Sequence, residues 1–436
     1  MTQPKPLHCA ALLALLTCAL LLAGCGAVDA QTVRNVAEYQ IRKALPPLLV
    51  YREPPAPASL SGVVQDEAGQ PIPNAVVLVS TVRGEDVHVR SDATGRYRLE
   101  DISPGRYVPM AGAWGYDAVN GPAVRLSPGQ QRDGVDFILP ARRPQPVAPV
   151  DLQIGQPVQE SSQFPQPMTA TRIPFSFTLD GVRIDNGQIY LPAPQARSEI
   201  GNHPGGTGLS EGTVPTLVII YPSHPLNWNA ASVALTRDGN PVLALGPHSS
   251  GGLNIDQHAR NYRAALHLWQ SGQLTPLGRP GDAWAAMSGS FSSLIMFKAL
   301  QDLPAMPPAI VAVGGVSDAF LGVQALYDAD LAIPPPYDSA VAALGRPDRD
   351  PAFFYGFSPV FYADRLPPTF VIHTTNDEVI PYNQAEALAA ALAAAGVPHE
   401  LLLYEDTTHY LDAYNPTPAT HRVYERVLDY VRTLGR

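Results

Sequence analysis

Short apolar runs alternate with helical segments from Thr216 onward, and this order constrains the fold more than any other feature of the chain. The runs have the length of buried strands, and they cover 216–222, 241–247, 283–287, 309–315, 369–374 and 399–405. Hydrophobic residues recur at helical spacing in 254–270, 383–396 and 419–434, and Gly396 closes the second of these helices. The alternation predicts an α/β domain with a mostly parallel sheet and helices on both faces.

A hairpin is expected at the start of this domain, which we place at residues 159–436. Apolar and polar positions alternate in 174–194, and the dipeptides Asp180-Gly181 and Asn186-Gly187 interrupt the pattern. Both dipeptides favour the backbone of tight turns, so we expect each of them to connect two strands.

Residues 59–140 have a different pattern, in which period-two alternation is broken by Gly, Pro and Asp. This pattern predicts a small all-β sandwich. The stretches GVVQDEAGQPIPNAVV and SDATGRYRLEDISPGRY resemble the carboxypeptidase regulatory-like domain, which implies a prealbumin-like fold without catalysis of its own. In such a fold four side chains become core and corner residues: Tyr97, Leu99, Ile102 and Tyr107.

Two connecting segments are predicted around the sandwich. Residues 25–58 read as a tether, with one short helix marked by Val33, Val36 and Ile41 and then the proline-rich stretch REPPAPA. Residues 141–158 begin with ARRPQPVAPV, a composition typical of a stiff interdomain linker.

The amino terminus has the pattern of an export signal. Lys5 precedes the apolar run 9–28, whose fully apolar core is shorter than the roughly 20 residues that cross a bilayer. The run contains Leu22-Ala23-Gly24-Cys25, which resembles the bacterial lipobox. That resemblance implies removal of residues 1–24, attachment of diacylglycerol to Cys25, and a place on the outer membrane or cell surface. An uncleaved transmembrane anchor is the alternative, and both readings put the body outside the cytoplasm.

Composition excludes several classes of function. The net charge of −10 argues against nucleic-acid binding, which needs a basic face. All three cysteines lie within the first 25 residues, so the remaining chain has no disulfide, cysteine metal site or catalytic cysteine. The chain has no His/Asp/Glu cluster with metal spacing, no phosphate-binding glycine loop and no dinucleotide motif, so we expect no cofactor.

The stretch WAAMSGSFSSLIMFKAL, residues 284–300, places small residues between a strand and a helix. A serine nucleophile at such a junction needs a sharp, strained turn with small residues on both sides. Ser290 is flanked by Ser288 and Ser292 in a variant of the G-x-S-x-G pattern. The alternative is that these serines only cap the helix.

Two further residues follow later strands in the order expected for a catalytic triad. Asp377 follows the run 369–374, and His409 follows 399–405, so neighbouring strands would bring both side chains beside Ser290. Three other acids could replace Asp377 as the carboxylate that orients the imidazole: Asp364, Asp406 and Asp412.

These motifs resemble the α/β-hydrolase fold and, within it, the catalytic domain of the prolyl oligopeptidase (S9-like) family and related esterases, over about 160–436. The resemblance implies that Ser290 is the nucleophile, His409 the general base and then acid, and Asp377 the orienting carboxylate. It also implies an oxyanion hole formed by the backbone N–H of Phe291 and a second donor. For that donor we consider the Tyr221 hydroxyl and, equally, the backbone of Ser223 or His224, in a stretch that reads YPSHP where the family has His-Gly-Gly.

The sequence therefore predicts an extracytoplasmic serine hydrolase that cleaves a small-molecule ester or peptide substrate through an acyl-enzyme. It leaves open which bond is cleaved. The alternative is a surface lipoprotein whose hydrolase domain is inactive and serves as a binding or scaffold module.

Overall fold

The computed structural model describes residues 30–44, 55–163, 167–193, 214–278, 283–327, 342–409 and 418–434. The chain forms two compact units. The first contains the described residues up to Arg143 together with the segments Ser249–Leu253 and Ala319–Phe361, and the second contains the rest.

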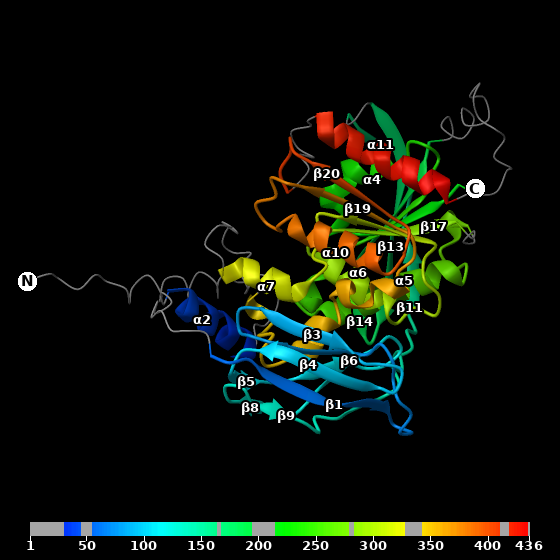
Figure 1. Ribbon diagram of the computed structural model, residues 1–436. Coiled ribbons are helices and arrows are strands. Elements are labelled where there is room, and N and C mark those ends of the chain that lie inside the picture. The colour runs from blue at the N-terminus through cyan, green and yellow to red at the C-terminus, as the bar shows by residue number, and fades with distance from the viewer. Residues whose placement is uncertain are drawn as a thin grey trace, which may run out of the picture. The chain divides into compact units, whose positions relative to one another are not determined.

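The first unit is built around a β-sandwich of short strands (Figure 1). One sheet has the order β10-β1-β4 with β9 paired to β1, another has the order β3-β2-β6-β7, and β5 pairs with β8. The strands are β1 (Ala58–Asp66), β2 (Val76–Ser80), β3 (Asp86–Arg90), β4 (Arg96–Ile102), β5 (Gly105–Tyr107), β6 (Met110–Gly112), β7 (Val119–Asn120), β8 (Val124–Leu126), β9 (Gln131–Arg132) and β10 (Phe137–Leu139).

The predicted core and corner residues of the sandwich are confirmed. Tyr97, Leu99, Ile102 and Tyr107 are all buried in its hydrophobic core. The Tyr97 hydroxyl donates to the carbonyl of Val135 at 2.6 Å, and the Tyr107 hydroxyl donates to a main-chain carbonyl four residues earlier at 2.7 Å. Each aromatic ring is thus buried while its polar end keeps a partner.

The helix expected in the tether region forms as α2 (Ala30–Ala44), but it is not part of a free tether. Val36 and Tyr39 are buried, and the Tyr39 hydroxyl donates to the carbonyl of Leu326 at 3.1 Å. Glu38 forms a salt bridge with Arg346 at 2.7 Å. The helix is therefore fixed within the first unit.

The segment 319–361 lies between β18 and β19 in the sequence but packs within the first unit. It contains α7 (Ala319–Tyr327) and α9 (Pro351–Tyr355). The Asn120 side chain donates to Asp350 at 2.7 Å and accepts from the Ala352 N–H at 3.0 Å. A long-range association of this kind carries no local sequence signal, so no pattern in the sequence predicts it.

The second unit contains the expected α/β domain, with a ten-stranded mixed sheet of order β11-β13-β14-β16-β15-β17-β18-β19-β20 and β12 paired to β13. The six strands β15 to β20 run parallel to one another. The strands β11 to β14, at one edge of the sheet, pair antiparallel. The strands are β11 (Val150–Ile154), β12 (Val158–Ser162), β13 (Met168–Leu179), β14 (Val182–Pro192), β15 (Thr216–Ile220), β16 (Val242–Leu245), β17 (Trp284–Gly289), β18 (Ala309–Val313), β19 (Thr369–Thr374) and β20 (His399–Tyr404).

Helices cover both faces of this sheet, as predicted (Figure 1). Apolar residues of α4 and α11 pack on one face in a single core cluster with alternate residues of β15 to β19. The other face is covered by α5, α6 and α10. The helices are α4 (Asn229–Leu235), α5 (Ile255–Gln270), α6 (Ser292–Leu300), α10 (Asn383–Ala394) and α11 (Pro418–Thr433). The architecture is that of an α/β-hydrolase preceded by a small β-sandwich.

The hairpin prediction is right for one dipeptide and wrong for the other. Asp180 and Gly181 have φ values of 52° and 79° and connect β13 to β14. Asn186 and Gly187 instead lie inside β14, beside a register irregularity opposite Phe175. A Cβ at Gly187 would come 2.5 Å from the Phe175 ring, so this glycine makes room for an aromatic side chain rather than for a turn.

The linker is shorter than the predicted range 141–158. The strand β11 lies within this range and β12 begins at its end, and both pair with β13 at the edge of the large sheet. Both strands are mostly exposed, which is typical of an edge, although β11 alternates the apolar Val150, Leu152 and Ile154 with polar residues as a strand does. Among the residues that the structure describes, no helix combines the length and apolarity needed to traverse a bilayer.

We predict that Gly187→Ala lowers stability by about 1–3 kcal/mol, because the added methyl group meets a buried ring. The thermal unfolding midpoint measures this loss. The same substitution in a Phe175→Leu background should cost clearly less, since the smaller side chain frees the space. Equal losses in the two backgrounds would contradict the packing explanation.

Candidate active site

Ser290 lies on a sharp turn between β17 and α6. Its φ of 54° is unusual for a residue with a side chain, and its N–H donates to the carbonyl of Val313 at 3.0 Å. The turn therefore has the strained backbone that a nucleophile at a strand-to-helix junction needs. A helix cap needs no such conformation at this position.

The serines after Ser290 hold this turn in place. The Ser292 hydroxyl lies 2.5 Å from the carbonyl of Ile220 and accepts from the Gly289 N–H at 3.1 Å. The Ser293 hydroxyl lies 2.7 Å from the carbonyl of Ser290 and accepts from the Val316 N–H at 2.8 Å. These bonds tie α6 to the ends of β15 and β18, a contribution that glycine at the flanking position could not make.

Ser288, on the other flank, has a different environment. It is 1% exposed, and its hydroxyl has no hydrogen-bond partner within the described residues. It is a small buried side chain in β17 and has no contact that would activate its hydroxyl.

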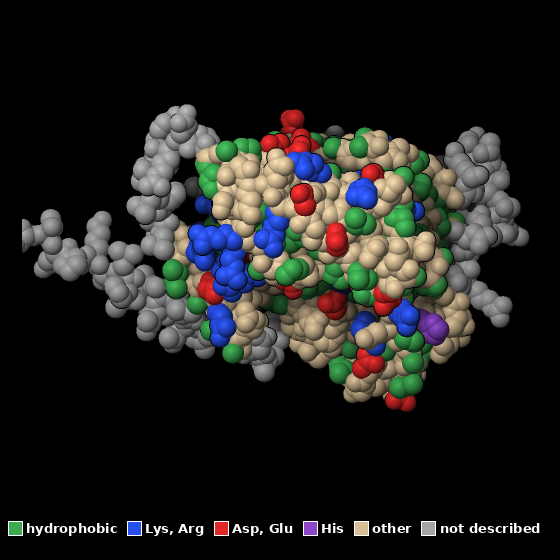
Figure 2. Space-filling model, turned by 60° about the horizontal axis from the view of Figure 1, so that its bottom comes forward, with side chains coloured by type: hydrophobic (Ala, Val, Ile, Leu, Met, Phe, Trp, Pro, Cys, Tyr) green, Lys and Arg blue, Asp and Glu red, His purple; other side chains and the backbone are tan. Residues whose placement is uncertain are grey.

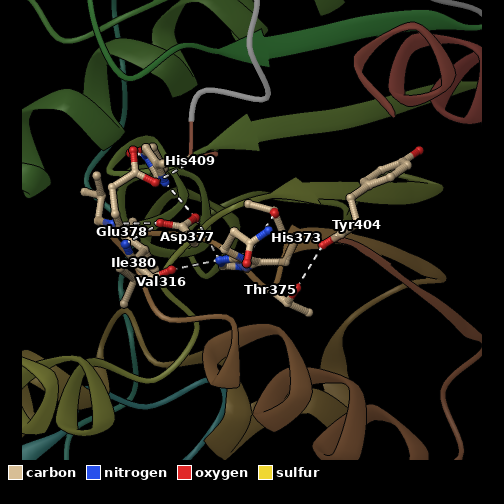
Figure 3. Close-up of polar contacts among 12 residues, drawn as sticks. Val316, His373, Thr375, Asp377, Glu378, Ile380, Tyr404 and His409 are labelled. Carbon is tan, nitrogen blue, oxygen red and sulfur yellow. Dashed lines mark hydrogen bonds and ion pairs between the residues drawn. The ribbon is translucent and has the colours of Figure 1, made fainter. Parts of the chain in front are cut away.

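His409 reaches Ser290 from the loop after β20. Its Nε2 lies 2.8 Å from the Ser290 Oγ, and its Nδ1 lies 2.7 Å from the Asp377 Oδ2. The backbone N–H of His409 donates to the Glu378 carboxylate at 3.2 Å. Figure 3 shows the imidazole turned toward Asp377, so the three predicted side chains form one chain of hydrogen bonds.

The Asp377 carboxylate is fully buried and fully hydrogen-bonded. Its Oδ1 accepts from the N–H groups of Val379 (2.9 Å) and Ile380 (2.7 Å), while its Oδ2 faces His409 and His373. Burial alone would raise the pKa of Asp377, but the hydrogen bonds from His373 and His409 outweigh it and lower the pKa to about 2. The carboxylate is therefore ionised at neutral pH.

His373 is a second imidazole on Asp377. Its Nε2 donates to the carbonyl of Ile380 at 2.9 Å and lies 3.1 Å from the Asp377 Oδ2 (Figure 3). Its Nδ1 is buried without a partner among the described residues, so Nε2 makes the polar contacts of the ring. The spacing of four residues before Asp377, at the end of β19, was the available signal.

The other acids considered as orienting groups are not placed at His409. Asp364 pairs with Arg365 at 3.1 Å, and no contact joins Asp406 to the imidazole within the described chain. Asp412 lies outside the described residues. Asp377 is thus the carboxylate that the structure brings to His409.

Two glycines after β18, Gly314 and Gly315, let the backbone lie close to the side chains of the site. A Cβ at Gly314 would lie within 3.9 Å of both His409 and Asp377, and one at Gly315 would come 2.7 Å from the Ser293 side chain. Gly314 also has a φ of 54°. The Gly-Gly dipeptide in the strand run 309–315 was visible in the sequence, but its partners were not.

The backbone N–H of Phe291 is available to an oxyanion. It opens the helix α6 directly after Ser290, and no hydrogen bond to it is found among the described residues. The N–H groups of Ser223 and His224, after β15, are likewise without a partner in the described part of the chain. Either could be the second donor.

The Tyr221 hydroxyl is not the second donor, and that prediction is wrong. The hydroxyl lies 2.9 Å from the Ser232 Oγ inside the core, and the ring stacks on Trp228 with centroids 5.5 Å apart. Alternation along β15 explains this, because Tyr221 points to the same face as Leu217 and Ile219, which α4 and α11 cover.

The arrangement suits acyl transfer through a serine nucleophile. A serine hydroxyl faces the free nitrogen of an imidazole whose other nitrogen is fixed by a carboxylate, which is the geometry of an activated nucleophile. No group of His, Cys, Asp and Glu side chains able to hold a metal ion is found in the described ranges.

Two family models match the chain. Residues 59–140 match the carboxypeptidase regulatory-like domain, and residues 282–434 match the prolyl oligopeptidase family. The second match contains Ser290, Asp377 and His409. The first spans the same residues as the predicted sandwich.

Solved structures similar to the chain include peptidases and esterases. The acylaminoacyl peptidase of Pyrococcus horikoshii is 11% identical with a TM-score of 0.45, and the match covers 85% of this chain and 63% of that one. Carboxyl esterase 2 of Tuber melanosporum is 12% identical with a TM-score of 0.44, over 65% of this chain and 89% of that one.

Among curated proteins, a non-reducing polyketide synthase of Penicillium brevicompactum is 43% identical over 54 residues. This match covers 12% of the chain and only 2% of the length of that relative. The prolyl oligopeptidase match and the site geometry together identify the chain as a serine hydrolase, with esterase and peptidase not distinguished.

We predict that Asp377→Asn reduces kcat by about 10³–10⁴-fold, because the amide cannot hold the imidazole in the required tautomer. Steady-state hydrolysis of an activated ester measures the loss. His373→Ala is the comparison, since it removes one donor from the carboxylate but leaves the His409 contact, and it should reduce kcat far less.

Asp377→Asn should also change how stability depends on pH. A carboxyl group whose pKa is about 2 in the folded protein and about 4 in the unfolded chain contributes about 2–3 kcal/mol above pH 4, and this contribution is lost as pH falls toward 2. Unfolding midpoints of the wild type should therefore fall more steeply between pH 4 and 2 than those of the variant. Parallel curves would contradict the lowered pKa.

Proposed function

We propose that the chain is a lipid-anchored, extracytoplasmic serine hydrolase that forms an acyl-enzyme on Ser290. The single observation that carries the catalytic part is the 2.8 Å contact between the Ser290 Oγ and the His409 Nε2, in an imidazole already bound to Asp377. The substrate is a small molecule or peptide with an ester or amide bond.

The His409 imidazole takes the hydroxyl proton as the Ser290 Oγ attacks the substrate carbonyl carbon. The new C–O bond leaves negative charge on the carbonyl oxygen, which the Phe291 N–H and one N–H from Ser223 or His224 stabilise. The tetrahedral intermediate then breaks its bond to the leaving group, which receives the proton from His409. A water molecule repeats the sequence on the acyl-enzyme and restores the free hydroxyl.

Asp377 supports both halves of this cycle. Its carboxylate accepts the Nδ1–H of His409, so Nε2 is the basic nitrogen that faces the hydroxyl. When the imidazole carries two protons, the buried negative charge offsets the new positive one. The backbone and His373 contacts keep the carboxylate ionised throughout.

The proposed location rests on the amino-terminal sequence. The run 9–28 and Leu22-Ala23-Gly24-Cys25 support processing before Cys25 and attachment of lipid to its thiol. These residues lie outside the described ranges. Small residues before the cysteine suit the active site of a signal peptidase.

A fluorophosphonate probe tests the catalytic assignment, because it reacts with activated serines. Residues 26–436 should be labelled, and Ser290→Ala should abolish labelling. Ser288→Ala is the matched control, since it removes a buried hydroxyl two residues away that has no partner in the described chain, and it should keep the label.

Labelling that survives Ser290→Ala would place the nucleophile elsewhere. No labelling of the wild type would favour the inactive binding or scaffold module. With a labelled enzyme, turnover of short acyl esters compared with dipeptide and proline-containing amides then distinguishes an esterase from a peptidase.

The anchor is tested by expressing the full chain in a bacterium with radioactive palmitate. We expect Cys25→Ser to abolish incorporation and to prevent cleavage before that position. Cys18→Ser is the control, because the thiol lies within the same apolar run but outside the lipobox-like sequence, and it should leave incorporation unchanged. Incorporation in the Cys25 variant would refute the assignment.

A further inference from the structure

The segment that carries His409 has few backbone contacts with the strand beside it. The strands β19 and β20 pair in parallel up to Thr374 and Tyr404, and the Thr375 N–H donates to the Tyr404 carbonyl at 2.8 Å. Beyond this bond, no backbone hydrogen bond joins the described residues 405–409 to β19 or to the loop after it. The place of His409 relative to that loop therefore depends on side-chain contacts.

Residues 374–378, here called the acid segment, supply these contacts to residues 405–409, the histidine segment. The Asp377 carboxylate holds the His409 imidazole at 2.7 Å, and the Glu378 carboxylate accepts the His409 N–H at 3.2 Å (Figure 3). Two further side chains of the acid segment bond carbonyl groups of the histidine segment. Four side chains therefore converge on the segment that presents the imidazole.

The contact made by Thr374 is buried at both ends. Its hydroxyl donates to the Thr407 carbonyl at 2.6 Å and accepts from the Asn376 N–H at 3.3 Å. Thr374 is 1% exposed, and Thr407 is 3% exposed. Because bulk water does not reach this place, a carbonyl that loses the hydroxyl stays without a partner.

The other two contacts with the backbone of the histidine segment lie at the surface. Figure 2 shows many charged side chains on one face of the molecule, where water can take the place of a lost partner. Asn376, which donates to the Glu405 carbonyl, and Glu378 are likewise exposed. Of these three contacts, the one from Thr374 is therefore the least replaceable.

The Asp377 carboxylate has separate support. Its Oδ1 accepts from the N–H groups of Val379 and Ile380, and its Oδ2 faces His373 as well as His409. Loss of the Thr374 hydroxyl should therefore release the histidine segment while the carboxylate stays in place.

We propose that Thr374 is a positioning residue of this site: its buried hydroxyl fixes the backbone two residues before His409, and through it the imidazole relative to Ser290. The proposal rests on the proposed acyl transfer by Ser290. Thr374 acts only through His409, whose Nε2 lies 2.8 Å from the Ser290 Oγ. Such a contact has to be held within about 0.5 Å, because small displacements of reacting groups cost large factors in rate.

Two valine substitutions test this role, because valine has the shape of threonine without the hydroxyl. For Thr374→Val we expect kcat for an activated ester to fall about 30–100-fold, while KM changes less than about twofold. Thr407→Val is the matched control. Its hydroxyl is also buried but has no hydrogen-bond partner among the described residues, so kcat should stay near the wild-type value.

Two further readouts separate positioning from a general loss of structure. Thr374→Ser keeps the hydroxyl and should restore most of kcat. With a fluorophosphonate, Thr374→Val should react about 30-fold more slowly but reach the same final labelling as the wild type. The final extent counts folded sites, whereas the rate reports the geometry of His409 and Ser290.

Thr374→Ala serves if the valine variant does not fold. The smaller side chain leaves space in which water can bond the Thr407 carbonyl, so no buried group is left unpaired. Water does not tie that carbonyl to β19, so kcat should still fall about tenfold.

Equal kcat values for Thr374→Val and Thr407→Val would overturn the positioning role. A raised KM with incomplete labelling, and no recovery in Thr374→Ser, would overturn it as well, because Thr374 would then support only the fold. A wild type that is not labelled contradicts the proposed function instead. In that case crystal structures of the wild type and Thr374→Val still test the contact: we expect a displaced His409 beside an unmoved Asp377, and an unmoved His409 refutes the proposal.

Discussion

The Asp377 carboxylate lies in the interior of the α/β unit, and four donors converge on it: the N–H groups of Val379 and Ile380 and the imidazoles of His409 and His373. A buried charge without such partners costs several kcal/mol, so the loop after β19 can adopt this shape only with the donors in place. Their combined effect holds the carboxylate ionised. The orientation of His409, and through it the contact with Ser290, depends on this one buried charge.

The turn at Ser290 exposes the nucleophilic hydroxyl at the closely packed junction between β17 and α6. The positive φ is costly for a residue with a side chain, and hydrogen bonds from Ser292 and Ser293 to neighbouring backbone hold it. Small residues are required there because β17, α6 and the Gly314-Gly315 loop approach closely. The serine-rich stretch is therefore both the source of the candidate nucleophile and its support.

Strong local patterns predicted much of this arrangement. The strands β15 to β20 and the helices α5, α10 and α11 appear close to the predicted ranges, because buried runs and helical spacing are visible in a single sequence. The meeting of Ser290, Asp377 and His409 was predictable, because the loops that follow parallel strands of one sheet lie at the same edge of that sheet.

Other features depend on contacts that no local pattern reports. Asn186-Gly187 has the composition of a turn, but the Phe175 ring occupies the space that the glycine leaves open. The segment 319–361 joins the sandwich through residues more than 200 positions away, such as Asn120 with Asp350. The Tyr221 error was avoidable, since alternation along β15 already directs its side chain toward the core.

The central claim is that Ser290 attacks while the Phe291 N–H receives the developing oxyanion. The most direct measurement is a crystal structure of the protein after reaction with a small fluorophosphonate, whose adduct has the tetrahedral geometry of the intermediate. We expect phosphorus bonded to the Ser290 Oγ, a phosphoryl oxygen within hydrogen-bonding distance of the Phe291 nitrogen, and the His409 Nε2 facing the adduct. Phosphorus on another side chain, or a phosphoryl oxygen turned away from Phe291, would contradict the claim.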